Sequence, residues 1–409
     1  MSIWRTESWK FNGPKGAGLL LAVWLGLSAA QGIQSLPSGS RQNLRHKPVR
    51  EVPAPAADPV ESEPPAKKGS PPRGLASGDE VLVAIIDTGV DVQHPALAPF
   101  IWKNQGEVGL DSQGRDKSNN GVDDDGNGFI DDVHGFDFNT KRGAVKDLNG
   151  HGTHIAGIIA ARLKTAGIEN VKFMVLNYYR DGIDGPTALH NSIECVRYAI
   201  QMNAKIINYS GGGLYPNPRE RQIFMEAERR GILVVAAAGN EASNSESSPF
   251  FPANYGFSNI LSVTAVDGAS LRILPSSNYG KRSVHVAASG KDIRSTLPGG
   301  LYGTMTGTSQ ATAVVTGHAI RAYIQGDRPS PEMVMEMVLA SSSPQRGLAG
   351  KTQAGTLLAD RDLDWIEAKA GGHSRGKNVS SALGEALLKV LTDGEERGLV
   401  VKSSQRPAL

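Results

Sequence analysis

The chain has 409 residues, a formal net charge of +2, 39% hydrophobic residues and 21% charged residues. This length and balance indicate that the bulk of the chain is globular, with a core of substantial size. The near-neutral charge argues against a nucleic-acid partner, because nucleic-acid-binding domains are usually strongly basic. The single cysteine, Cys195, excludes an intramolecular disulfide, and its place beside an apolar helical stripe predicts a small buried hydrophobe.

Residues 1–30 have the pattern of a secretory signal. Basic residues precede the segment GAGLLLAVWLGLSAA, which is apolar and has small residues at Ser28 and Ala30 near its end. We expect cleavage after about Ala30 and export of the rest, either secreted or to the periplasm and cell envelope. No stable membrane insertion is expected if the signal is cleaved. The alternative is an uncleaved membrane anchor.

Residues 31–78 are rich in proline and show neither the period of a strand nor that of a helix. We interpret this segment as an extended linker or a short pro-segment.

The ordered part is expected over residues 79–345, where apolar runs alternate with helical patterns. The run Val81 to Ile86 is continuously apolar, as in a strand buried on both faces. Strands are predicted at 81–86, 172–176, 205–209, 232–238, 260–266 and 284–288, and helices at 152–164, 187–202, 218–230 and 309–324. This alternation predicts an α/β fold with three layers: a mostly parallel, twisted sheet with helices on both faces.

The sequence texture changes after Ser330. The segment SPEMVMEMVLASSS predicts one covering helix. Residues 346–409 are treated as a C-terminal extension, in which 380–393 form an amphipathic helix behind a serine cap. Packing against the domain is the favoured role of this helix, and partner binding is the alternative.

Four polar residues lie at element ends, where function gathers in parallel sheets. Asp87 directly follows a buried strand, His151 lies at the start of a helix, Asn240 follows a strand and Ser309 begins another helix. Each has a purely structural alternative: a turn for Asp87 and Asn240, and a helix cap for His151 and Ser309. His154 competes with His151.

Together the four residues match the requirements of a serine hydrolase, which are a nucleophile, a base, a carboxylate that orients the base, and an oxyanion donor. The chain order Asp, His, Ser is that of subtilisin. The segments VAIIDTGVDVQHPAL, HGTHIAG, AAAGN and GTSQAT resemble the corresponding motifs of the subtilisin-like serine proteases. The resemblance spans roughly residues 78–340.

The resemblance implies an endopeptidase that acts on polypeptides. Ser309 would attack the peptide carbonyl, His151 would accept its proton, Asp87 would orient His151, and Asn240 would stabilise the oxyanion. The substrate would add as a β-strand along a cleft. The residues that would line it are Ser210, Gly211, Gly212, Ala238 and Gly239. A monomer is expected, and the chemistry itself requires no cofactor.

Two departures from the family pattern follow the predicted nucleophile. Gln310 stands where the family usually has Met, and Ala313 where it usually has Pro. Residues 31–78 also do not resemble the folded inhibitory pro-domain of exported relatives. The alternatives to an endopeptidase are therefore a catalytically impaired binding or scaffold protein on the same fold, and an ester hydrolase with the same mechanism.

An acidic insert, NNGVDDDGNGFIDDVHGFDF, lies between the Asp and His motifs at 119–138. Asp123, Asp125, Asn127 and Asp131 are spaced so that several oxygens converge on one Ca²⁺. The insert is not a complete EF-hand loop, because His134 stands where the loop would have its glutamate. The alternative is a solvated acidic turn.

Overall fold

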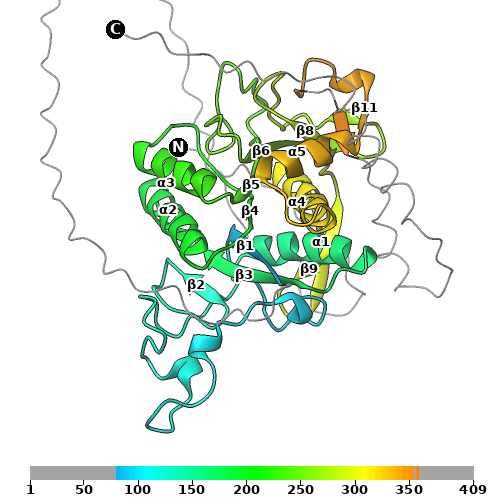
Figure 1. Cartoon of the computed structure of the whole chain (residues 1–409). Coiled ribbons are helices and arrows are strands. Elements are labelled where there is room, and N and C mark those ends of the chain that lie inside the picture. Colours follow the sequence, from blue (N-terminus) through cyan, green and yellow to red (C-terminus); the bar gives the residue numbers. More distant parts are fainter. Residues whose placement is uncertain (1–79, 354–355, 359–409) are drawn as a thin grey trace, which may run out of the picture. The chain divides into compact units, whose positions relative to one another are not determined.

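The computed structural model describes residues 80–353 and the backbone of 356–358 (Figure 1). The predicted signal segment, the proline-rich segment and the predicted helix at 380–393 lie outside these residues. No helix within the described ranges is both long enough and apolar enough to cross a membrane.

A ten-stranded sheet forms the centre, in the order β11-β12-β8-β6-β5-β4-β1-β3-β2 with β7 paired to β6. Neighbours from β12 to β2 along this order are parallel, and the pairs β11–β12 and β6–β7 are antiparallel. The strands of the parallel part are β1 (Val81–Asp87), β2 (Gly135–Asp137), β3 (Val171–Asn177), β4 (Ile206–Tyr209), β5 (Leu233–Ala237), β6 (Ile260–Asp267) and β8 (Val286–Ser289).

Helices cover both faces of the sheet, and β1 shows why (Figure 1). Every residue of β1 is buried. Val83 and Ile85 pack in one core cluster with side chains of α1, α4 and α5, whereas Ala84 and Ile86 pack in another with α2 and α3. Because successive strand side chains point to opposite faces, a continuous apolar run serves both layers. The predicted three-layer α/β fold is confirmed.

The helices are α1 (His151–Thr165), α2 (Gly185–Gln201), α3 (Pro218–Arg229), α4 (Thr308–Gln325) and α5 (Pro331–Ala340). The starts of three of them are fixed locally. The side chains of Asp184, Asn217 and Ser330 accept backbone N–H groups of the first turns of α2, α3 and α5. A proline follows each cap within the first helical turn, where its missing N–H costs nothing.

Several short elements were not predicted. They are β2, the 3₁₀ helices η1 (Ala98–Phe100), η2 (Gln105–Glu107), η3 (Lys117–Asn119) and η4 (Arg346–Leu348), and the strands β7 (Arg272–Ile273), β9 (Ile293–Leu297), β10 (Leu301–Met305), β11 (Ser342–Pro344) and β12 (Thr356–Leu358). Strand β12 pairs with β8, so the sheet continues past residue 345, where the sequence analysis ends the domain. Strands β11 and β12 have three residues each, which is too few to show a period.

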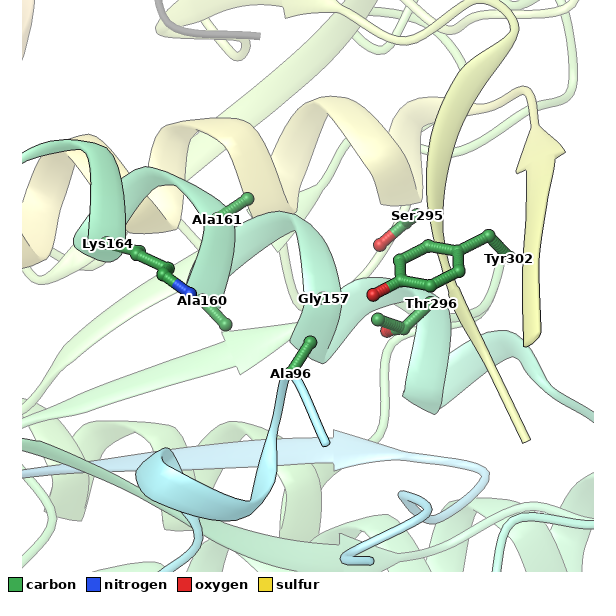
Figure 2. A pocket seen from close by; sticks show the side chains of 8 residues that line it. All are labelled: Ala96, Gly157, Ala160, Ala161, Lys164, Ser295, Thr296 and Tyr302. Atoms are coloured by element: carbon green, nitrogen blue, oxygen red, sulfur yellow. The ribbon is translucent and has the colours of Figure 1, made fainter. Parts of the chain in front are cut away.

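The β9–β10 hairpin packs on α1 and leaves a small cavity of about 20 Å³ (Figure 2). Ser295 Oγ and Thr296 Oγ1 donate to the α1 carbonyls of His154 and Thr153, both at 2.7 Å. A Cβ on Gly157 would lie 2.2 Å from Thr296 Oγ1, so only glycine allows this approach. The cavity holds about one water molecule at most, and we interpret it as a packing gap.

Candidate active site

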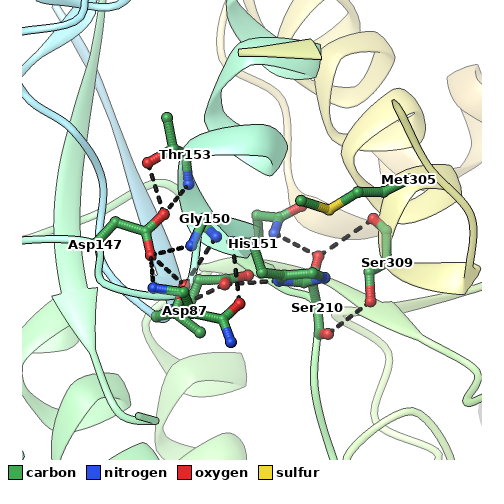
Figure 3. A network of polar contacts seen from close by, with 12 residues as sticks. Asp87, Asp147, Gly150, His151, Thr153, Ser210, Met305 and Ser309 are labelled. Carbon is green, nitrogen blue, oxygen red and sulfur yellow. Dashed lines mark hydrogen bonds and ion pairs between the residues drawn. The ribbon is translucent and has the colours of Figure 1, made fainter. Parts of the chain in front are cut away.

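The structure brings the predicted catalytic residues to one edge of the sheet, beyond the carboxyl ends of β1, β4 and β5. Asp87 ends β1, and α1 begins with His151 (Figure 3). Asn240 follows β5 by three residues, and Ser309 lies in the first turn of α4. Asp87, His151 and Ser309 are 3%, 4% and 2% exposed, so these three side chains are largely shielded from water.

Asp87 and His151 form a direct pair. Asp87 Oδ1 lies 2.8 Å from His151 Nδ1 and also accepts the Thr88 N–H at 2.8 Å. A carboxylate at Nδ1 favours the tautomer that carries its proton there, which leaves Nε2 to accept a proton.

The competing histidine has a different environment. His154 is fully buried, and its Nε2 lies 2.9 Å from the Ile293 carbonyl oxygen. Burial, followed by repulsion from His151, lowers the pKa of His154 to about 3. His154 is therefore neutral at physiological pH and ties α1 to β9, whereas His151 contacts the carboxylate.

Ser309 is not the helix cap. Gly307 takes the N-cap position in an extended conformation and makes no side-chain cap, so Ser309 is the second residue of α4. Ser309 Oγ donates to the Ser210 carbonyl at 3.0 Å, and Ser210 Oγ donates to the Ser309 carbonyl at 3.3 Å. The hydroxyl thus faces the end of β4. The Ser309 backbone N–H lies in the first turn, where helical N–H groups have no intrahelical acceptor.

Asn240 is oriented by Thr308, the residue before Ser309. Its Oδ1 accepts the Thr308 backbone N–H at 3.0 Å and the Thr308 hydroxyl at 3.1 Å. These contacts fix which end of the amide is the oxygen, so the Nδ2 donor points away from α4.

The loop that carries Asn240 is held by a buried residue that the sequence analysis missed, Asn278. Its Oδ1 accepts the N–H groups of Glu241 and Ser243, and its Nδ2 donates to the Ala238 carbonyl at 2.8 Å. The Asn278 N–H donates to the carbonyl of Gly239, which has a φ of 101°. The predicted cleft residues Ala238 and Gly239 therefore belong to a rigid loop.

The glycines after Ser210 are required by close packing. A Cβ on Gly211 would lie 2.0 Å from the Tyr178 hydroxyl oxygen. A Cβ on Gly212 would lie 2.3 Å from the Phe251 carbonyl oxygen, and its φ of 153° disfavours other residues. The groups that lie close to Gly211 and Gly212 belong to the protein itself. Substrate binding along 210–212 therefore stays a prediction.

The sequence comparisons decide the family. The family model of the subtilases, Peptidase_S8, matches residues 78–363. The chain belongs to the subtilase family. By that membership it is a serine endopeptidase.

Known relatives agree with this subtilase in sequence and in fold. It is 32% identical to the major intracellular serine protease of Bacillus subtilis (strain 168), over 59% of this chain and 67% of that protein. It is 35% identical to the thermophilic serine proteinase of Bacillus sp. (strain AK1), over 61% of this chain and 53% of the relative. The crystal structure of a cold adapted subtilisin-like serine proteinase has a TM-score of 0.51 at 24% identity and covers 69% of this chain and 90% of that one. This structural similarity supports the subtilisin-like fold of the chain.

The two departures from the family pattern leave α4 intact. Gln310 and Ala313 are both fully buried, and α4 runs without a break through both. Gln310 Nε2 lies 3.8 Å from Met305 Sδ, and Ala313 packs in the core shared with α1. Alanine is a strong helix former, so the helix does not need a proline at this position.

The acidic insert brings together a set of oxygens that differs from the predicted one. Carboxylate oxygens of Glu107, Asp123 and Asp125 all lie within 4.8 Å of one another. The Asn127 backbone N–H donates to Asp123 Oδ1 and Asp125 Oδ1, both at 3.1 Å. Asp131 instead accepts the Gly121 N–H at 3.1 Å.

Glu107 comes from η2, ahead of the insert, and no sequence signal distinguishes it. It is fully buried. Its Oε1 accepts the Asp124 N–H at 2.8 Å, but its Oε2 has no hydrogen-bond partner among the described residues. Burial, together with the negative charges of Asp132, Asp125 and Asp124, raises the pKa of Glu107 to about 7.

Proposed function

We propose that this subtilase cleaves peptide bonds in polypeptides with Ser309 as nucleophile, His151 as general base, Asp87 as its orienting carboxylate and Asn240 as an oxyanion donor. The contact of 2.8 Å between Asp87 and His151 carries the proposal, because it prepares His151 Nε2 to accept a proton. No metal is needed for these steps.

The proposed reaction has two halves. The Ser309 hydroxyl turns from the Ser210 carbonyl toward His151, gives up its proton to Nε2, and Oγ adds to the substrate carbonyl carbon. His151 then protonates the leaving amine, which departs and leaves an acyl-enzyme. Water then gives a proton to His151 and attacks the acyl-enzyme. The carboxylic acid leaves, and His151 returns the proton to Ser309.

The oxyanion would be stabilised by Asn240 Nδ2 and the Ser309 N–H. Thr308 holds the Asn240 oxygen, which supports Nδ2 as the free donor of that amide. The start of α4 adds the positive end of the helix dipole. An extended substrate would lie along Ser210, Gly211 and Gly212, with Ala238 and Gly239 on the other side of the cleft.

Labelling with a peptidyl phosphonate tests the proposal, because such probes react with an activated serine. We expect mass spectrometry to locate the label on Ser309 of the wild-type protein. The variant Ser309→Ala should not be labelled, and Ser341→Ala at the exposed end of α5 should be labelled normally. Absence of wild-type labelling would support a catalytically impaired scaffold instead, and labelling with turnover of esters but not peptides would support an ester hydrolase.

Export is also part of the proposal. It is supported by the pattern of residues 1–30, which lie outside the described residues. One relative is itself named an intracellular protease, so family membership does not decide the location. The proposed mature protein acts as a monomer in the periplasm, the cell envelope or the medium.

We propose that Glu107, Asp123 and Asp125 help to hold a structural Ca²⁺. Three carboxylates within 4.8 Å repel one another, and a cation removes this repulsion. The buried Oε2 of Glu107 is an acceptor without a donor, and Ca²⁺ is bound by such carboxylate oxygens. Asn127 and Asp131, the other two ligands expected from the sequence, stay predictions.

Calcium is expected to raise the midpoint of thermal unfolding. At a concentration of about 100 times Kd the gain is about 2.7 kcal/mol, or roughly 5–10 °C for a domain of this size. The midpoint should fall when EDTA removes the ion. Glu107→Gln should abolish the difference between calcium and EDTA, whereas Asp124→Asn removes an equal charge from the same insert and should keep it. Equal midpoints of the wild type in calcium and EDTA would contradict the site.

A further inference from the structure

A second buried carboxylate, Asp147, lies behind the catalytic pair (Figure 3). It stands four residues before His151 in the loop that leads into α1, and it is only 7% exposed. The sequence analysis did not single it out, because Asp before Leu-Asn-Gly has the pattern of an ordinary turn.

Asp147 receives hydrogen bonds on both oxygens. Its Oδ1 accepts from Thr88 Oγ1 at 3.0 Å, Asn149 N at 3.0 Å and Gly150 N at 2.7 Å. Its Oδ2 accepts from Thr153 N at 2.8 Å and Thr153 Oγ1 at 2.6 Å. This is a large number of donors for one side chain, and three of them are backbone N–H groups.

The two hydroxyls are oriented by further backbone groups. Thr88 Oγ1 accepts the Gly152 N–H, and Thr153 Oγ1 accepts the Asp91 N–H, both at 3.0 Å. Each hydroxyl thus accepts a hydrogen bond from a backbone N–H group and donates its own hydrogen bond to Asp147. Burial raises the pKa of Asp147, and the hydrogen bonds from Thr153 and Gly150 oppose this rise. The surrounding donors fit the ionised carboxylate, which accepts and does not donate.

These contacts join the two elements that carry the catalytic pair. Thr88 follows Asp87 directly, and its N–H donates to Asp87 Oδ1. Gly150 and Thr153 flank His151, and the Thr153 N–H belongs to the unpaired first turn of α1. One carboxylate therefore fixes the end of β1 and the start of α1 relative to each other.

We infer that Asp147 is a positioning residue for catalysis, which holds Asp87 and His151 in register and adds a negative charge behind them. The inference rests on the proposed function of this site. Its second effect is electrostatic, since a nearby negative charge favours the protonated form of His151 that appears during the reaction.

Asp147→Asn tests both effects with almost no change in size. An asparagine has one acceptor oxygen, so its NH₂ group must face either the Gly150 and Asn149 N–H groups or the Thr153 N–H. We expect kcat to fall by about 10- to 100-fold with KM little changed, because the substrate is bound but the catalytic pair is misplaced. The midpoint of the pH–rate profile should move to lower pH, because the lost charge no longer favours protonated His151.

Other ionisable groups lie near this network. They are Asp87 on β1, His151 and the neutral His154 on α1, the neighbouring Lys146, and Asp181, which accepts from Asn149 Nδ2 at 3.1 Å. Asp181→Asn removes the same charge from an exposed position that does not bond to Thr88 or Thr153. We expect its kcat to stay within about twofold of the wild type and its pH midpoint to stay the same.

A readout without turnover separates this inference from the proposed function. In the Ser309→Ala background, NMR titration of His151 should give a lower pKa when Asp147→Asn is added. If Asp147→Asn does not fold, Thr88→Val removes one donor at nearly constant volume, and kcat should fall on the order of tenfold. An unchanged His151 titration, together with a kcat within twofold of the wild type, would overturn the inference and leave Asp147 a purely structural residue.

Discussion

Ser309→Ala and His151→Ala are each expected to lower kcat for peptide cleavage by about 10⁶-fold, the scale measured for the same changes in subtilisin, a member of this family. The double variant should lose no more than either single variant. The physical reason is that the serine hydroxyl is a poor nucleophile until His151 takes its proton. Because the two residues act as one unit, removing either one removes the contribution of both.

Single-turnover kinetics with a fluorogenic peptide and active-site titration would measure these losses. Far-UV circular dichroism and the unfolding midpoint serve as controls that both variants are folded. His154→Gln is a poor control, because His154 is buried and ties α1 to Ile293. If the losses were additive, or if His151→Ala kept a kcat near that of the wild type, another group would have to be the base.

The parts of the site that were predictable lie at element ends. Asp87, His151 and Asn240 were found because an apolar strand or a helical pattern stops or starts beside each of them. The order of strands in a parallel sheet then places their ends together. This reasoning needs only local sequence and a general rule of topology.

The supporting residues were not predictable because their partners are distant in sequence. Asn278 holds the loop of Asn240 by accepting the Glu241 N–H, a contact that spans 37 positions of the sequence. Glu107 meets Asp123 and Asp125 through the course of a long loop. Asp147 is close to His151 in sequence, but its contact with Thr88 spans 59 residues. No periodicity marks contacts of this kind.

The structural alternative for Ser309, a helix cap, does not match the structure. Serine is a common cap, and the local sequence favours it. In the structure Gly307 takes the cap position, and Asn240 Oδ1 accepts the N–H of Thr308, the first helical residue. Ser309 is the second helical residue, and its hydroxyl donates to the Ser210 carbonyl instead of capping the helix.

Asn240→Ala is expected to lower kcat by about 10²- to 10³-fold while KM changes little. The substrate carbonyl is uncharged in the bound complex and becomes an oxyanion only in the transition state, so the Nδ2 donor matters most there. Steady-state kinetics on one peptide substrate would separate kcat from KM. A rise in KM with kcat unchanged would instead make Asn240 a binding residue.

A second substitution separates the donor from the structural contact. Asn240→Asp keeps an oxygen for Thr308 but replaces the donor by a carboxylate oxygen, so it should lower kcat at least as far as Asn240→Ala does. Thr308→Val removes the hydroxyl contact of 3.1 Å and keeps the backbone contact of 3.0 Å, so its loss should stay near tenfold. If Asn240→Asp retained wild-type kcat, the oxygen contact with Thr308 would be the function of Asn240, and the oxyanion would depend on the helix N-terminus alone.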